Sequence, residues 1–91
     1  GGVVESVARA HGVVVLKDLA GHGIGRKLHE PPDVPNWADP DNTAVLHEGL
    51  VFALEPMFAL RDHRIKEEAD GWTVRTRRRS FAIHHEHTIM V

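Results

Sequence analysis

The 91-residue sequence contains no cysteine. A disulfide framework and any thiolate metal site are therefore excluded. A basic excess is also missing, because 11 lysines and arginines are set against 13 acidic residues, for a formal charge of -2. Since proteins that bind nucleic acid through its phosphates carry a clear positive excess, we expect no direct nucleic-acid binding.

Long hydrophobic runs are absent too. The longest apolar run, residues 50–54, is far shorter than the roughly 20 residues that span a bilayer, so we expect no membrane attachment. The N-terminus lacks the basic and apolar regions of a signal peptide, which favours a cytoplasmic location. The chain begins without an initiator methionine and ends within an apolar run, and we interpret both ends as cut.

The composition is that of an ordinary soluble domain, or of a piece of one, with 42% hydrophobic and 26% charged residues. Apolar residues at helical spacing predict a short helix over residues 2–11, capped by Gly12. The β-branched run 13–16 predicts a strand. Residues 18–42 contain four turns rich in glycine or proline, which together predict a long loop.

A second apolar segment, residues 50–60, alternates with period two and predicts a strand. Pro56 has no N–H to donate to a ladder, so Glu55 is expected where this strand ends, bulges or lies at an edge. Asp70-Gly71 indicates a hairpin between strands at 64–67 and 72–76. Residues 82–91 predict a final strand, with His84, Glu86, Thr88 and Met90 on one face and His85, His87, Ile89 and Val91 on the other.

Three side chains are candidate metal ligands. His22 lies in the glycine-rich segment 21–25, where small neighbours leave its imidazole uncrowded. Glu55 is the one charge in its apolar strand, which is costly unless the carboxylate is paired or metal-bound. Glu86 lies among three histidines. One imidazole and two carboxylates suit divalent Mn, Fe, Co or Zn.

Each of these residues also has an ordinary explanation. A histidine in a glycine-rich loop is often only a loop residue, and a glutamate before proline can be half-exposed at a sheet edge. Glu86 could belong to a solvated polar strand face. The arginines at 75 and 77–79 are interpreted as a solvated turn, because few aromatic residues accompany them.

Taken together and in order, the motifs resemble the C-terminal half of type I methionine aminopeptidases. The matching segments are Gly-His-Gly-Ile-Gly-Arg at 21–26, Leu-His-Glu-Pro-Pro at 28–32, Asn-Trp at 36–37, the run 49–57, Asp-Gly-Trp-Thr-Val-Arg-Thr at 70–76 and Glu-His-Thr-Ile-Met-Val at 86–91. They cover essentially the whole chain. The related Xaa-Pro aminopeptidases and creatinases usually have a different hairpin and a different final strand.

The resemblance implies an α+β structure, half of a pita-bread fold with a short helix and an antiparallel β-sheet. Residues 1–91 would form the C-terminal portion of a methionine aminopeptidase-like catalytic domain whose N-terminal half is absent. The implied activity removes the N-terminal methionine from nascent polypeptides, by attack of a metal-bound hydroxide on the first peptide bond. The implied cofactors are two divalent ions (Co, Mn, Fe or Zn), and the implied partners are the nascent N-terminus and the ribosome.

The same resemblance assigns roles to individual residues. His22 would bind one metal with Glu55, Glu86 would bridge both metals, and Glu55 could also take a proton from the attacking water. His29 would act in catalysis by hydrogen-bonding the scissile amide. The pocket for the substrate methionine would include Leu28, Met57 and Trp72.

The resemblance is incomplete in two respects. Two aspartate ligands of the family's N-terminal half have no counterpart here, so the chain carries three of five expected ligands and is expected to be inactive alone. His84 and His85 stand where the family usually has glutamine and an aromatic residue. Extra imidazoles there could offer alternative ligands or crowd the pocket.

Two other functions remain open at this point. One is a non-catalytic pita-bread relative that binds a peptide or protein partner. The other is a half-domain that binds a single metal ion and self-associates to bury its open sheet.

Overall fold

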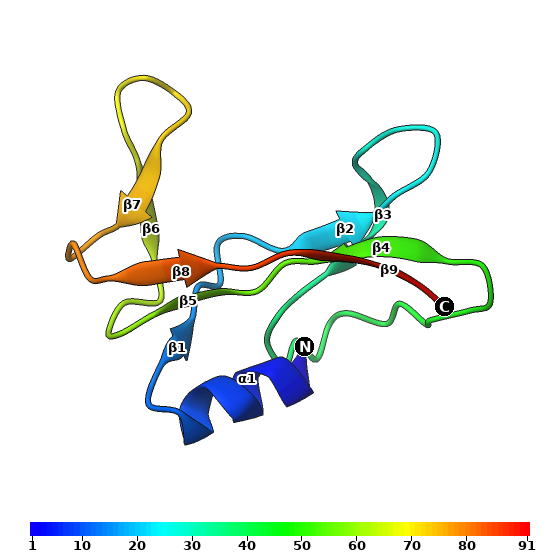
Figure 1. Cartoon of the computed structure of the whole chain (residues 1–91), viewed down its shortest axis with the longest axis horizontal. Helices are drawn as coiled ribbons and strands as arrows, with labels where there is room; N and C mark the ends of the chain where they lie inside the picture. Colours follow the sequence, from blue (N-terminus) through cyan, green and yellow to red (C-terminus); the bar gives the residue numbers. More distant parts are fainter.

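The structure, a computed structural model, describes residues 1–91 and contains one helix and nine short strands (Figure 1). The elements are α1 (Gly2–Ala10), β1 (Val14–Val15), β2 (Gly21–Gly23), β3 (Glu30–Val34), β4 (Val51–Leu54), β5 (Met57–Ala59), β6 (Ile65–Glu67), β7 (Val74–Thr76), β8 (Ala82–His84) and β9 (His87–Met90). All strand pairs are antiparallel. The predicted α+β class is therefore confirmed.

Three sheets organise these strands. The largest has the order β3-β2-β4-β9, the second has the order β1-β5-β8, and β6 pairs with β7 alone. Because β4 leads into β5 and β8 leads into β9, the two larger sheets form one long ribbon (Figure 1). Helix α1 lies on one side of this ribbon, while the β2–β3 and β6–β7 hairpins project from the other side.

The helix is one residue shorter than predicted and is followed by Gly12, whose φ of 71° suits the left-handed position after a helix end. It buries only Ala8, which joins a small apolar core of Val15, Leu16, Phe52, Ala53 and Ala59. The nine residues of α1, the only helix, are too few to cross a membrane.

The prediction of a long loop over residues 18–42 is wrong, because β2 and β3 lie within it. The glycines of β2 have a low strand propensity, so the sequence does not predict this strand. Because they have no side chain, they let β2 lie close to β3 and β4. A Cβ on Gly21 would collide with the carbonyl oxygen of Ala53 in β4, and one on Gly23 with that of Pro31 in β3. The prolines of β3 are tolerated because β3 is an edge strand.

The long strands predicted at 50–60 and 82–91 are each divided in two. The first is interrupted at Glu55-Pro56 and the second at His85-Glu86. Pro56 cannot donate a ladder hydrogen bond, which explains the first break. Its carbonyl still accepts a bond of 3.2 Å from the backbone N–H of His85. Of the three positions expected for Glu55, the end of a strand is therefore the one observed.

The predicted hairpin is confirmed as β6 and β7, with Gly71 at a φ of 70° in the connecting turn. Two carboxylates anchor its base. The Asp18 carboxylate accepts the backbone N–H of Ile65, which lowers its pKa, and it pairs with Arg64 at 2.6 Å. The Asp62 carboxylate accepts the backbone N–H of Arg78 at 2.7 Å, which lowers its pKa as well.

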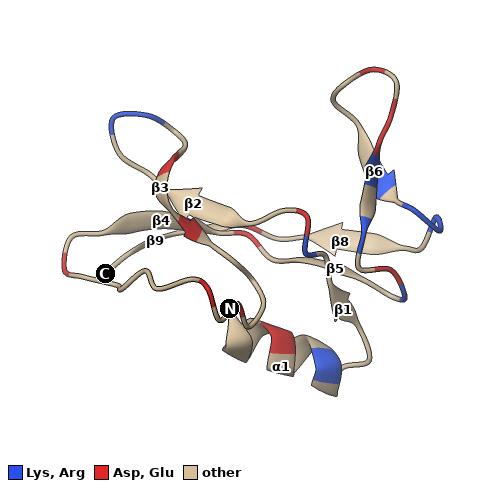
Figure 2. Ribbon diagram, turned by 180° about the vertical axis from the view of Figure 1, so that it is seen from behind, with Lys and Arg blue, Asp and Glu red and all other residues tan.

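Basic residues gather at this hairpin and the turn after it (Figure 2). Arg75 pairs with Glu68 there. Asp70 shapes the tip, because its carboxylate accepts the hydroxyl of Thr73 at 2.6 Å and the backbone N–H of Trp72 at 3.0 Å. These bonds lower the pKa of Asp70. The position of Trp72 at the tip is therefore set by an ordered turn.

Candidate metal centre

Glu55 and Glu86 fall opposite each other where the long ladder is interrupted. Leu54 pairs with His87 on one side of the break, and Met57 pairs with His84 on the other. The register is the same on both sides, so Glu55 is placed across from Glu86. Like charges directly opposite in a sheet destabilise it. A cation between the two carboxylates removes that penalty.

His22 reaches the same face from β2. It pairs with Ala53 of β4, which pairs in turn with Thr88 of β9, so these three side chains share one face. Glu55 and Glu86 are each two residues from that row and follow the same alternation. The Nε2 atom of His22 lies 3.3 Å from Oε1 of Glu55, and both side chains are largely buried.

The orientation of the His22 ring is fixed by a backbone contact. Its Nδ1 lies 3.0 Å from the carbonyl oxygen of Gly23, and only the ring nitrogen can donate in that pair. Nε2 is therefore the ring nitrogen that faces Glu55. A histidine held in this way is the usual arrangement of a metal ligand.

His84 approaches Glu55 from the other side. Its Nε2 lies 3.3 Å from Oε2 of Glu55. Glu55, His84 and Glu86 each offer one ligand atom, and these atoms lie within 4.8 Å of one another. This group of three donors contains His84. His22 lies outside the group and contacts one of its members, Glu55.

The donor set fits a divalent ion. Two ligand atoms on a tetrahedral ion with bonds near 2.1 Å are separated by about 3.4 Å. The two distances from Glu55 to imidazole nitrogens are both 3.3 Å. Nitrogen and carboxylate donors in this mixture suit Zn, Fe, Co or Mn.

His29 lies beside the donors. Its ring centroid is 4.1 Å from that of His22, and the two residues line one cleft. The side chain is exposed on the β2–β3 connection. That connection is held by Glu30, whose carboxylate accepts the backbone N–H of Lys27 at 2.8 Å. The histidine is therefore placed to contact a molecule bound at the metal centre.

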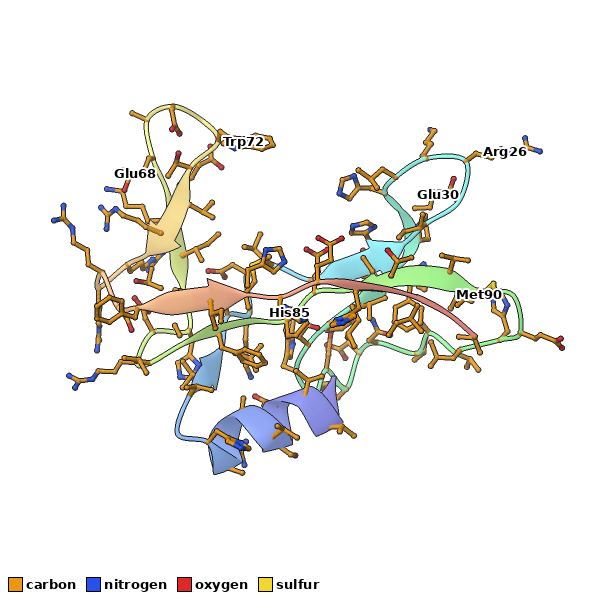
Figure 3. All side chains as sticks on the ribbon, in the orientation of Figure 1. Arg26, Glu30, Glu68, Trp72, His85 and Met90 are labelled. Carbon is orange, nitrogen blue, oxygen red and sulfur yellow. The ribbon has the colours of Figure 1, made fainter.

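The residues predicted to bind the substrate side chain lie around the same face. Met57 is paired with His84 across the β5–β8 ladder. Leu28 and Trp72 are 67% and 89% exposed, and they belong to the two projecting hairpins. In Figure 3, Trp72 points from its hairpin tip towards the β2–β3 connection. Met57 thus shares the metal face, whereas Leu28 and Trp72 project from that side of the ribbon on its two hairpins.

Two further residues near the site, His84 and Asn36, are not among the site residues predicted from the sequence. For His84 the sequence leaves two alternatives open, a further ligand or a residue that crowds the pocket, and its period-two spacing from Glu86 places both on one face. Asn36 is fully buried, and its Nδ2 donates to the backbone carbonyl of Glu55 at 3.4 Å. Its place in the Asn-Trp segment is the only signal that the sequence offers.

Comparison with known proteins extends these observations. The chain is 42% identical over 91 residues to a methionine aminopeptidase of Salmonella typhimurium, covering 100% of this chain and 34% of that protein. It is 44% identical over 92 residues to methionine aminopeptidase 2 of Bacillus subtilis, covering 100% of this chain and 37% of that one. The chain thus spans about a third of the length of these relatives.

Solved structures of methionine aminopeptidases also resemble this chain. A methionine aminopeptidase from Thermotoga maritima superposes with a TM-score of 0.90 at 40% identity, over 97% of this chain and 35% of that one. One from Rickettsia prowazekii gives 0.89 at 37% identity, over 100% of this chain and 38% of that one. These matches confirm the predicted pita-bread fold. The model of metallopeptidase family M24 matches residues 1–91, and the chain therefore belongs to this family.

Proposed function

We propose that residues 1–91 are the C-terminal portion of the catalytic domain of a methionine aminopeptidase. The activity is the metal-dependent removal of the N-terminal methionine from nascent polypeptides. The observation that carries the proposal is the placement of Glu55 opposite Glu86, with an imidazole on either side of Glu55, in a chain of a metallopeptidase family. The names of its relatives support the substrate.

The metal ligands from this chain are His22, Glu55 and Glu86. Two divalent ions (Co, Mn, Fe or Zn), when bound, supply an activated water nucleophile and polarise the substrate carbonyl. Residues outside this chain complete the second ion's coordination. Glu55 has a second role, because a carboxylate at this position can accept the proton of the attacking water.

His29 contacts the reacting group of the substrate. Its exposed imidazole beside His22 can donate a hydrogen bond to the scissile amide. Donors aimed at the charge that develops in the transition state lower the barrier more than they favour the ground state. We therefore assign His29 to stabilisation of the tetrahedral intermediate and His22 to metal binding.

We assign the methionine side chain of the substrate to the apolar surface offered by Leu28, Met57 and Trp72. All three are apolar, and none could pair with a charged side chain. Such a pocket rejects a side chain that is one methylene shorter or longer by about 1–3 kcal/mol. We propose a nascent N-terminus as the natural substrate, and with it a cytoplasmic location close to the ribosome.

The experiment is the release of methionine from a Met-Ala-Ser peptide by the full protein supplied with Co²⁺ or Mn²⁺. We expect release in the wild type, and none after Glu86→Gln, which also loses its metal. A protein that binds metal and the peptide but releases no methionine would overturn the proposal in favour of a peptide-binding module.

A further inference from the structure

We propose that His84 is a metal ligand, so that this chain offers an ion two imidazoles and two carboxylates instead of one imidazole and two carboxylates. This inference rests on the proposed function, because it concerns the same metal centre. It adds a donor from β8, a strand that supplied none of the ligands predicted from the sequence.

The first support is the position of the imidazole. A ring nitrogen of His84 belongs to the group of donor atoms that lie within 4.8 Å of one another, together with Glu55 and Glu86. Neighbouring donors on one tetrahedral ion lie about 3.4 Å apart, so closure around an ion needs the donor atoms to approach one another by up to about 1.4 Å, which side-chain rotation can supply.

The second support is the symmetry about Glu55. Oε1 faces His22 and Oε2 faces His84, each at 3.3 Å. A charge-assisted hydrogen bond between an imidazolium and a carboxylate is shorter, about 2.7–2.9 Å. Both distances therefore match the separation of neighbouring ligands better than that of a tight ion pair.

The third support is the contrast between His84 and its neighbour His85. His87 pairs with Leu54 and so faces away from His22. The ring of His85 contacts that of His87, with centroids 4.6 Å apart, which places His85 on the far face as well. His84 pairs with Met57 on the metal face. Of these two adjacent histidines, the structure assigns only His84 to the centre.

A second imidazole changes which ions the centre prefers. Imidazole suits the later divalent ions, which bind nitrogen donors more tightly in the order Mn, Fe, Co, whereas an oxygen-rich set suits Mn. The wild-type centre should therefore favour Co²⁺ over Mn²⁺ more strongly than a variant without His84. Substitution by glutamine removes the imidazole while keeping a polar side chain of similar length.

The test uses the full protein in four forms: wild type, His84→Gln, His22→Gln and His85→Gln. Each is loaded with one equivalent of Co²⁺. X-ray absorption counts imidazole ligands, and calorimetry gives the Kd for Co²⁺ and for Mn²⁺. We expect His84→Gln to lower the count from about two to about one and to raise the Co²⁺ Kd about tenfold or more.

Thermal unfolding of the metal-free forms checks that each variant is folded. His85→Gln should match the wild type in both measurements, and His22→Gln should also lose one imidazole. An unchanged count and Kd in His84→Gln, with metal binding intact in the wild type, would overturn the role of His84 and leave the proposed function standing. Equal losses in His84→Gln and His85→Gln would also overturn it. A wild type that binds no divalent ion would overturn both proposals.

Discussion

Glu55 and Glu86 face each other at the one point where the long antiparallel ladder is interrupted. The strands on either side keep a single register, so the two carboxylates stay opposite each other although Pro56 has no N–H to donate to the ladder. Two opposed carboxylates repel each other when no metal ion is bound, and together they attract a cation that both can bind. The break at Pro56 and the metal centre are therefore parts of one local arrangement.

Replacement of Glu55 by glutamine should have opposite effects on metal affinity and on metal-free stability. The variant loses a donor, so the Kd for Co²⁺ should rise about tenfold or more. In chelator, its melting temperature should equal or exceed that of the wild type, because the repulsion from Glu86 is gone. Calorimetry and thermal unfolding measure the two effects. Glu48→Gln, in an exposed loop, is the control that should change neither.

Replacement of His29 by alanine should separate catalysis from metal binding. We expect kcat for methionine release to fall about 10²-fold, in the range of a lost general acid or hydrogen-bond donor. The metal content should stay the same, because His29 touches His22 without being a ligand. Metal analysis and peptide assays on the same samples test this. A variant that loses its metal would show that His29 is a ligand. His47→Ala is the control, because His47 is also an exposed histidine.

Replacement of Gly23 by alanine should damage the centre without removing a ligand. The added Cβ collides with the backbone carbonyl of Pro31 and pushes β2 away from β3. We expect a loss of stability of about 3 kcal/mol and weaker metal binding. Gly2→Ala is the matched control, because its Cβ would meet only the Ala38 side chain at 3.7 Å. Equal stability of the two variants in denaturant would contradict the packing described for β2.

Acid should destabilise the β6–β7 hairpin, because it protonates the Asp62 carboxylate at the base of the hairpin. The folded state lowers the pKa of this carboxyl from its ordinary 3.8, chiefly through the backbone N–H of Arg78. Its stabilising effect is therefore present above pH 4 and is lost as the pH falls through the folded pKa. Asp62→Asn should be less stable than the wild type at pH 7, and the gap should narrow below pH 3.8. Thermal unfolding across that range measures it, and a gap independent of pH would be the contrary result.

Replacement of Trp72 by alanine should affect the substrate and leave the fold intact. The side chain is 89% exposed, so stability should change by less than about 0.5 kcal/mol. If Trp72 borders the methionine pocket, kcat/KM for a Met-Ala-Ser peptide should fall about tenfold. Phe81→Ala is the control, because Phe81 is similarly exposed, at 85%, but lines a separate apolar hollow with Val13 and Ile83. Equal effects of both variants on kcat/KM would argue against the pocket.

Local features of the structure were predictable because they depend on neighbours in the chain. Helix α1, the hairpin turn at Asp70-Gly71 and the break at Pro56 follow from spacing, left-handed glycine geometry and a missing N–H. Residues His22, Glu55 and Glu86 were singled out because their charge or imidazole was unusual for its surroundings, and the order of the motifs indicated the family.

The tertiary structure decided what these residues do together. Strand β2 was mistaken for loop because its glycines have low strand propensity, and only the close approach of β3 and β4 explains them. The opposition of Glu55 to Glu86 depends on a pairing register between distant segments. The place of His84 beside Glu55 depends on that same register. Sequence patterns show which face a side chain takes within one strand, whereas distances between strands are set by the hydrogen-bonded pairing of the whole sheet.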